Sequence, residues 1–240
     1  MIFRQFLHFQ PVAASYLFGC GGHATCAVVD PIGDVEAYIR AAADAKMQIR
    51  YVIDTHIHAD HISAGRALAA RAGAEYVMHR SVARNQITGV DDGQQLVLGN
   101  VIVDVLHTLG HTPEHISLLV SDRTRGGEPW LVMTGHTLMV GDMGRTELAT
   151  DAESGARTLY ESARKLRALP AEVEVWPGAF SGSICGKGLS GKPSSTIGFE
   201  RRFNRTFRIE DADAFVSEVL RDLPAPSANA AEIRAINLAA

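Results

Sequence analysis

A run of seven residues offers most of the chemistry in this sequence. Residues 55–61 read THIHADH, so three imidazoles and one carboxylate fall within six consecutive positions, at His56, His58, Asp60 and His61. Imidazole and carboxylate side chains suit zinc, iron, nickel or copper, and no cysteine is near in the sequence to make a closed thiolate site. The run therefore predicts a metal site, with His56 and His58 as ligands and with Asp60 and His61 as candidate catalytic residues.

The elements expected around this run explain how its side chains converge. Apolar residues 51–53 indicate a short buried strand, and the pattern over residues 63–72 indicates a helix. The run thus lies on a strand-to-helix loop, where an irregular backbone lets alternate side chains meet.

Two later histidines also follow predicted strands. His111 comes after a strand over residues 101–106, and His136 comes after a strand over residues 130–133. Loops at one edge of a sheet are the usual place for binding residues, so both histidines lie where they could join this site. His115 is a further catalytic candidate that orients a ligand or contacts substrate, with a purely structural histidine as the alternative.

Strands and helices alternate along the chain, which predicts an α/β fold in a single domain over residues 1–240. Further strands are expected at residues 2–9, 15–18, 26–29, 75–78, 116–120 and 174–176, and further helices at 35–45, 151–169 and 212–223. A polar connection is expected over residues 79–92 and an ordered glycine-rich loop near the site over 177–193. The tail, residues 224–240, is expected either to fray or to dock on a partner subunit.

Composition limits the classes of function. The 240 residues are 46% hydrophobic and 21% charged, as in an ordinary globular protein, and the net charge of −4 argues against nucleic acid or an acidic membrane as the main partner. The first residues are too polar for a signal peptide, and no stretch is long enough for a membrane span. Three scattered cysteines favour a reducing, cytoplasmic location. An apolar tail and an edge strand are compatible with a homodimer.

Several segments resemble motifs of the metallo-β-lactamase superfamily. They are the run at 55–61, residues 110–115 (GHTPEH) and residues 141–146 (GDMGRT), and the similarity continues through residues 193–204. The sequence looks closest to the persulfide dioxygenase branch, which neighbours glyoxalase II. This resemblance implies a four-layer αβ/βα sandwich. It also implies that Arg145 helps to bind a glutathione-type carboxylate, with a structural salt bridge as the alternative.

The sequence departs from this family pattern at two positions. In the persulfide dioxygenases, the resemblance implies one iron held by residues that match His56, His111 and position 136. The family has aspartate at position 136 and histidine at position 179, whereas this chain has His136 and Ala179. These changes weaken the family's second metal site, so we expect one metal per chain, with His58 completing the ligands.

The resemblance implies an Fe(II) enzyme that oxidises a small-molecule thiol or persulfide of glutathione type with O2. Neutral imidazole in place of carboxylate leaves the metal more positive, which favours an anionic sulfur. One alternative is a zinc-dependent hydrolase of thioesterase or lactonase type, and another is a relative that kept the fold and lost catalysis. Cys185, in the glycine-rich loop, either meets a sulfur substrate or is an inert small side chain.

Overall fold

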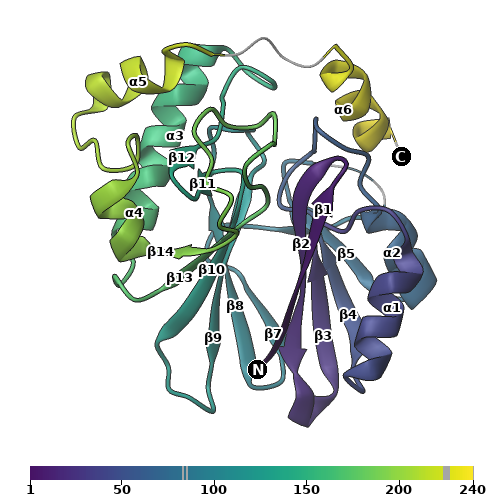
Figure 1. The fold of residues 1–240 in the computed structure, drawn as a ribbon. Helices are drawn as coiled ribbons and strands as arrows, with labels where there is room; N and C mark the ends of the chain where they lie inside the picture. Colours follow the sequence, from purple (N-terminus) through teal and green to yellow (C-terminus); the bar gives the residue numbers. More distant parts are fainter. Residues whose placement is uncertain (83, 85, 224–227, 240) are drawn as a thin grey trace.

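In a computed structural model that describes residues 1–82, 84, 86–223 and 228–239, the first half of the chain forms a six-stranded sheet (Figure 1). In sheet order, the strands are β1 (Ile2–Phe9), β2 (Val12–Cys20), β3 (Thr25–Val29), β4 (Gln48–Ile53), β5 (Glu75–His79) and β6 (Thr88–Val90). β1 to β3 are antiparallel, and β3 to β6 run parallel. Two of the parallel connections are the helices α1 (Val35–Asp44) and α2 (Gly65–Ala72), which cover one face.

The second half forms another six-stranded sheet, which is antiparallel except where β10 pairs with β13. In sheet order, its strands are β14 (Ser195–Thr196), β13 (Glu174–Pro177), β10 (Pro129–Gly135), β9 (Ile116–Asp122), β8 (Val101–His107) and β7 (Gln95–Leu98). The helices α3 (Ala152–Arg167), α4 (Ile197–Phe203) and α5 (Ala212–Leu220) cover its outer face (Figure 1). A small hairpin of β11 (Leu138–Met139) and β12 (Asp142–Met143) follows β10.

Three apolar layers hold these elements together. Phe18 and Leu118 pack between the two sheets, Leu68 packs between the first sheet and its helices, and Leu159 and Phe215 pack outside the second sheet. Strands covered on both faces are nearly continuous in apolar residues, as β2 is. The four-layer αβ/βα sandwich that the sequence predicted is confirmed.

Local sequence signals explain where the main helices begin. The carboxylate of Asp151 accepts a hydrogen bond from the Ser154 amide at 3.0 Å, and Asp211 accepts one from the Ala214 amide at 2.8 Å. Such caps satisfy amide groups that have no partner within the helix. The helices expected at 151–169 and 212–223 therefore start as predicted and end somewhat earlier.

The structure contains elements that the sequence did not predict, namely the strands β6, β7, β11, β12 and β14 and the helix α4. The connection expected over residues 79–92 contains the short strand β6, which completes the edge of the first sheet. The tail expected to fray or to dock on a partner contains α6 (Ala230–Ala239), which packs on the first half of this same chain (Figure 1). Residues 224–227 and 240 of that tail lie outside the described residues.

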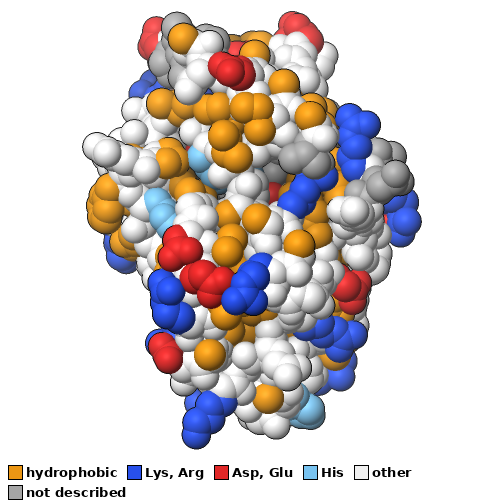
Figure 2. Space-filling model, turned by 90° about the vertical axis from the view of Figure 1, so that its right-hand side faces the viewer, with side chains coloured by type: hydrophobic (Ala, Val, Ile, Leu, Met, Phe, Trp, Pro, Cys, Tyr) orange, Lys and Arg blue, Asp and Glu red, His pale blue; other side chains and the backbone are white. Residues whose placement is uncertain are grey.

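The face that carries α1, α2 and α6 has a mixed surface. Figure 2 shows acidic and basic side chains interspersed with hydrophobic ones over this face, without a broad area of one charge. Within the described ranges, no helix combines the length and the apolar composition that a membrane span requires.

Candidate metal centre

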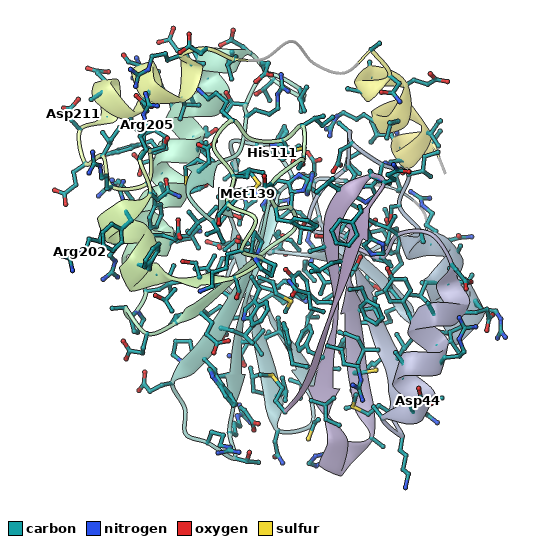
Figure 3. The ribbon with its side chains drawn as sticks, in the orientation of Figure 1. Asp44, His111, Met139, Arg202, Arg205 and Asp211 are labelled. Atoms are coloured by element: carbon teal, nitrogen blue, oxygen red, sulfur yellow. The ribbon has the colours of Figure 1, made fainter. Side chains whose placement is uncertain are left out.

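Three loops bring the predicted ligands to one end of the sandwich. His56, His58, Asp60 and His61 follow β4, whereas His111 lies between β8 and β9 and His136 directly follows β10. Figure 3 shows His111 near the end of the sheets at which α6 lies. The structure thus brings together all four histidines that the sequence predicted as ligands.

His56, His111 and His136 have the spacing of residues that share one metal ion. Each offers a ring nitrogen within 4.8 Å of the other two, and each is only 1% exposed. His111 Nε2 lies 3.3 Å from His136 Nδ1. Two nitrogens bound at about 2.0–2.1 Å to a tetrahedral metal are separated by roughly 3.3 Å. His56 Nε2 has no hydrogen bond within the described part of the chain, so its lone pair remains available to a metal.

Asp30 orients both histidines of the His-x-His pair. Its carboxylate accepts hydrogen bonds from the Thr55 hydroxyl at 2.9 Å and from His58 Nε2 at 3.2 Å. Because the Thr55 hydroxyl donates to Asp30, its oxygen accepts from His56 Nδ1, 2.9 Å away. These contacts place the proton on His56 Nδ1 and on His58 Nε2. The opposite nitrogens, His56 Nε2 and His58 Nδ1, are therefore the ones aimed at a metal.

His111 and His136 are positioned by main-chain groups and by His115. His111 Nδ1 donates to the Arg145 carbonyl oxygen at 2.7 Å, which leaves Nε2 for a metal. The backbone amide of His136 donates to His115 Nε2 at 3.1 Å. Gly135 precedes His136 with φ +47°, and a Cβ there would lie 2.5 Å from His115 Nε2. Glycine is therefore required at the turn that presents His136.

Burial keeps this cluster largely uncharged. Burial, and then the neighbouring imidazoles, hold the pKa of His56 well below its usual range and lower that of His111 to about 3. Burial also lowers the pKa of His136. Although burial acts in the opposite direction on His58, the Asp30 carboxylate raises the His58 pKa well above its usual value. Three of the four histidines are thus neutral, as a metal ligand must be, whereas His58 has to lose a proton from Nδ1 before that nitrogen can bind a metal.

Asp60, His58 and His61 form a second group beside the first, again with ligand atoms within 4.8 Å of one another. Neither carboxylate oxygen of Asp60 and neither ring nitrogen of His61 has a hydrogen bond among the described residues, although His61 Nδ1 lies 3.1 Å from Asp60 Oδ1. Burial alone would raise the pKa of Asp60, but the nearby His61 and His136 hold it well below its usual range. A buried carboxylate without hydrogen bonds is costly unless a cation binds it.

His115 and Arg145 contact the metal ligands from outside the cluster. His115 is fully buried behind His56, and its Nδ1 lies 3.0 Å from the hydroxyls of Thr108 and Thr137. Its Nε2 accepts from the His136 amide, so His115 contacts a candidate ligand, and a catalytic role for His115 stays a prediction. The guanidinium of Arg145 forms an ion pair with Glu147 and donates to the Ile184 carbonyl oxygen at 3.0 Å. Binding of a substrate carboxylate by Arg145 stays a prediction.

Asp30 and Cys185 lie next to the candidate ligands, although the sequence assigned neither of them to the metal site. The only local signal for Asp30 is its place after β3, where its φ is +48°, a value uncommon outside glycine. For Cys185 the sequence left open either contact with a sulfur substrate or an inert small side chain, and its sulfur lies within 4.8 Å of ligand atoms of Asp60 and His136. Ala179 is buried next to Gly178, whose amide donates to the Gly135 carbonyl, and its methyl group offers no ligand.

This combination of layers and ligands defines a class of metal-binding proteins. The sequence pattern of the metallo-beta-lactamase superfamily matches residues 11–178, and the chain belongs to this superfamily. The resemblance read from the sequence motifs is therefore confirmed. Members of the superfamily bind metal ions, and the clustered histidines and Asp60 are consistent with this.

Two curated relatives differ in their activities. A hydroxyacylglutathione hydrolase of Rhodospirillum rubrum is 30% identical over 167 residues, which are 68% of this chain and 60% of that protein. The mitochondrial persulfide dioxygenase ETHE1 of Homo sapiens is 27% identical over 176 residues, which are 70% of this chain and 65% of that protein. The chain thus spans less than two thirds of the length of either relative.

One solved structure matches from end to end. ETHE1 from Myxococcus xanthus has a TM-score of 0.85 and 29% sequence identity, and the match covers 100% of this chain and 99% of that chain. The similarity therefore includes the glycine-rich loop and the C-terminal helices as well as the two sheets.

Proposed function

We propose that this chain is an Fe(II)-dependent enzyme that oxidises the outer sulfur of a glutathione-type persulfide with O2. In the balanced reaction, the persulfide, O2 and water yield the thiol and sulfite. The observation that carries the proposal is the convergence of His56, His111 and His136, whose ring nitrogens lie within 4.8 Å of one another in a buried and largely neutral set. The end-to-end similarity to an ETHE1 structure supports it.

The charge of this ligand set favours an anionic sulfur. Three neutral imidazoles leave the charge of a divalent metal uncompensated, and the ionised Asp60 nearby reduces that charge without cancelling it. A persulfide anion is attracted to such a position. When bound, a non-haem iron with open coordination positions supplies the place at which sulfur and O2 meet.

The residues around the ligands have separate tasks. Asp30 and Thr55 fix the rings of His56 and His58, and the carbonyl of Arg145 fixes His111. Ligands held in this way need no rearrangement when the metal arrives. Because the ligand imidazoles are about 1% exposed, substrate entry requires movement of the loop over residues 177–193. Arg145 is itself buried and donates to Ile184 of that loop, so in our proposal its guanidinium reaches the glutathione carboxylate only after the loop has moved.

A zinc-dependent thioester hydrolase is the second candidate. Three histidines with one open position also hold catalytic zinc, which activates a water molecule. The 30% identity to a hydroxyacylglutathione hydrolase favours this candidate.

Parallel assays on one preparation distinguish the two candidates. We expect O2 consumption and sulfite formation that depend on added glutathione persulfide and are lost in His111→Ala. The matched control is His79→Ala, because His79 stacks on His107 away from the ligand cluster. Hydrolysis of S-lactoylglutathione without any persulfide-dependent O2 uptake would establish the hydrolase instead. Absence of both reactions in metal-loaded protein would support a non-catalytic relative.

A further inference from the structure

Cys185 belongs to the metal centre although it lies far from the other ligands in the sequence. Its Sγ, a carboxylate oxygen of Asp60 and a ring nitrogen of His136 lie within 4.8 Å of one another. Cys185 is 1% exposed, so the sulfur is turned into the protein and away from solvent. The glycine-rich loop thus adds a soft sulfur atom next to a carboxylate and an imidazole.

The two ring nitrogens of His136 face different groups. Nδ1 lies 3.3 Å from His111 Nε2, on the side of the three-histidine set. Nε2 lies 3.9 Å from Asp60 Oδ2, and Asp60 is the residue that groups with His136 and Cys185. Neither His136 Nε2 nor either oxygen of Asp60 has a hydrogen bond within the described ranges. Buried polar atoms normally have a hydrogen-bond or ionic partner. Because these atoms lie close together without a hydrogen bond, they indicate a site for a bound cation.

The loop holds the sulfur firmly in this place. The Cys185 carbonyl accepts a hydrogen bond from the Arg145 amide at 3.4 Å, and the Cys185 amide donates to the Ser183 hydroxyl at 3.2 Å. Two residues further on, the amides of Lys187 and Gly188 donate to Asp142 Oδ2 at 2.7 and 2.9 Å. Because the backbone is anchored before and after the side chain, little conformational entropy is lost when the sulfur binds a metal.

We propose that Asp60, Cys185 and Nε2 of His136 form a second, thiolate-containing metal position beside the three-histidine position. Ligand atoms around a tetrahedral zinc lie roughly 3.3–3.6 Å apart, so separations within 4.8 Å need to shorten by about 1.5 Å at most. Cys185 then supplies the ligand that the family resemblance places at position 179, where this chain has alanine. A thiolate, a carboxylate and an imidazole together suit zinc or another borderline-soft divalent ion, with a fourth place open.

This proposal changes the expectation of one metal per chain. With one ion on each nitrogen, the His136 ring is an imidazolate, and its N–H proton is released to solvent when the second ion binds. The two ions are then separated by roughly 6 Å, as two metal–nitrogen bonds of about 2 Å and the ring between them require. The proposal concerns metal binding alone, so it holds or fails independently of the reaction proposed above.

Cobalt titration of the metal-free protein tests the second position directly. Co(II) bound to a thiolate has a sulfur-to-metal charge-transfer absorption that Co(II) bound to histidine and carboxylate lacks. We expect the wild type to bind two Co(II) ions per chain, one of them with this absorption. Cys185→Ser is expected to lose the absorption and one ion while it keeps the other. Cys26→Ser is the matched control, because Cys26 is also a buried cysteine but lies in β3. This variant is expected to bind both ions and to keep the absorption.

Asp60→Asn provides a second test if Cys185→Ser does not fold. It is expected to weaken the ion that shows the absorption while the three-histidine ion stays bound. A single Co(II) per wild-type chain, or an absorption that persists in Cys185→Ser, would overturn the proposal. Persulfide-dependent O2 uptake is measured separately, so its absence would count against the proposed reaction and not against this site.

Discussion

The side-chain amide of Asn237 donates a hydrogen bond of 2.9 Å to the carbonyl oxygen of His58, which lies 179 residues earlier in the chain. The same amide nitrogen donates to the His61 carbonyl at 2.8 Å, and its oxygen accepts from the Ser63 amide at 3.0 Å. Three main-chain groups of the metal loop are thus satisfied by one residue of α6. Arg234 of the same helix donates to the Ile57 carbonyl at 2.8 Å.

We therefore expect Asn237→Ala to weaken the metal loop. Unpaired buried polar groups cost about 1–3 kcal/mol, so thermal unfolding should occur at a lower temperature. Metal affinity should fall about 10–100-fold, as for other losses of groups that orient ligands. Ile236→Ala is the control, because Ile236 is 40% exposed on the same helix. Equal metal affinity in the two variants would show that α6 only covers the surface.

His56→Ala and His111→Ala should each release the ion of the three-histidine position. Each change removes one of three nitrogen ligands, whereas both residues lie on loops outside the apolar layers, so the fold should persist. Elemental analysis and circular dichroism of the purified variants check both points. Stoichiometric metal at this position in either variant would refute the assignment of that ligand.

Asp30→Asn should reduce metal affinity without removing any ligand. An amide has nearly the shape of the carboxylate, but it cannot accept hydrogen bonds at both positions and carries no charge to hold His58. We expect a loss of about 10–100-fold in affinity, measured by competition with a chelator. Asp34→Asn is a suitable comparison, since Asp34 is an exposed cap of α1. Similar affinities for the two variants would contradict the orienting role of Asp30.

Replacing His136 should reduce metal binding more than the other substitutions do, because its side chain contributes a nitrogen to both proposed positions. His136→Ala should lower the metal content at each of them. His136→Asp restores the carboxylate of the relatives and should retain metal at the three-ligand position, with persulfide-dependent O2 uptake preserved or raised. Unchanged metal content in His136→Ala would mean that this imidazole only fills space.

The sequence predicted those parts of the site that have a local pattern. His56, His111 and His136 each follow an apolar strand, and strands with continuous apolar residues must be buried with their ends at a sheet edge. The contacts of Asp30, Cys185 and Asn237 have no such pattern. These residues meet the ligands only through tertiary structure: Asp30 because β3 pairs with β4, Cys185 because the two sheets pack, and Asn237 because α6 packs on the first half. A lone aspartate, cysteine or asparagine looks the same in the sequence whether or not it has such a contact. The short edge strand β6 was missed for a related reason, since three residues are too few to show alternation.

The division of the ligands between the two sheets has a consequence for the mechanics of the fold. His56 and Asp60 belong to the first half of the chain, whereas His111, His136 and Cys185 belong to the second. An ion held by both groups acts as a reversible cross-link between two halves that are otherwise held together by the apolar layer between the sheets and by hydrogen bonds such as that from the Ile116 amide to the Thr55 carbonyl. The halves then separate only after coordination bonds break. Metal binding should therefore slow hydrogen exchange of the backbone amides in β4 and in β10 together, although the two strands belong to different sheets.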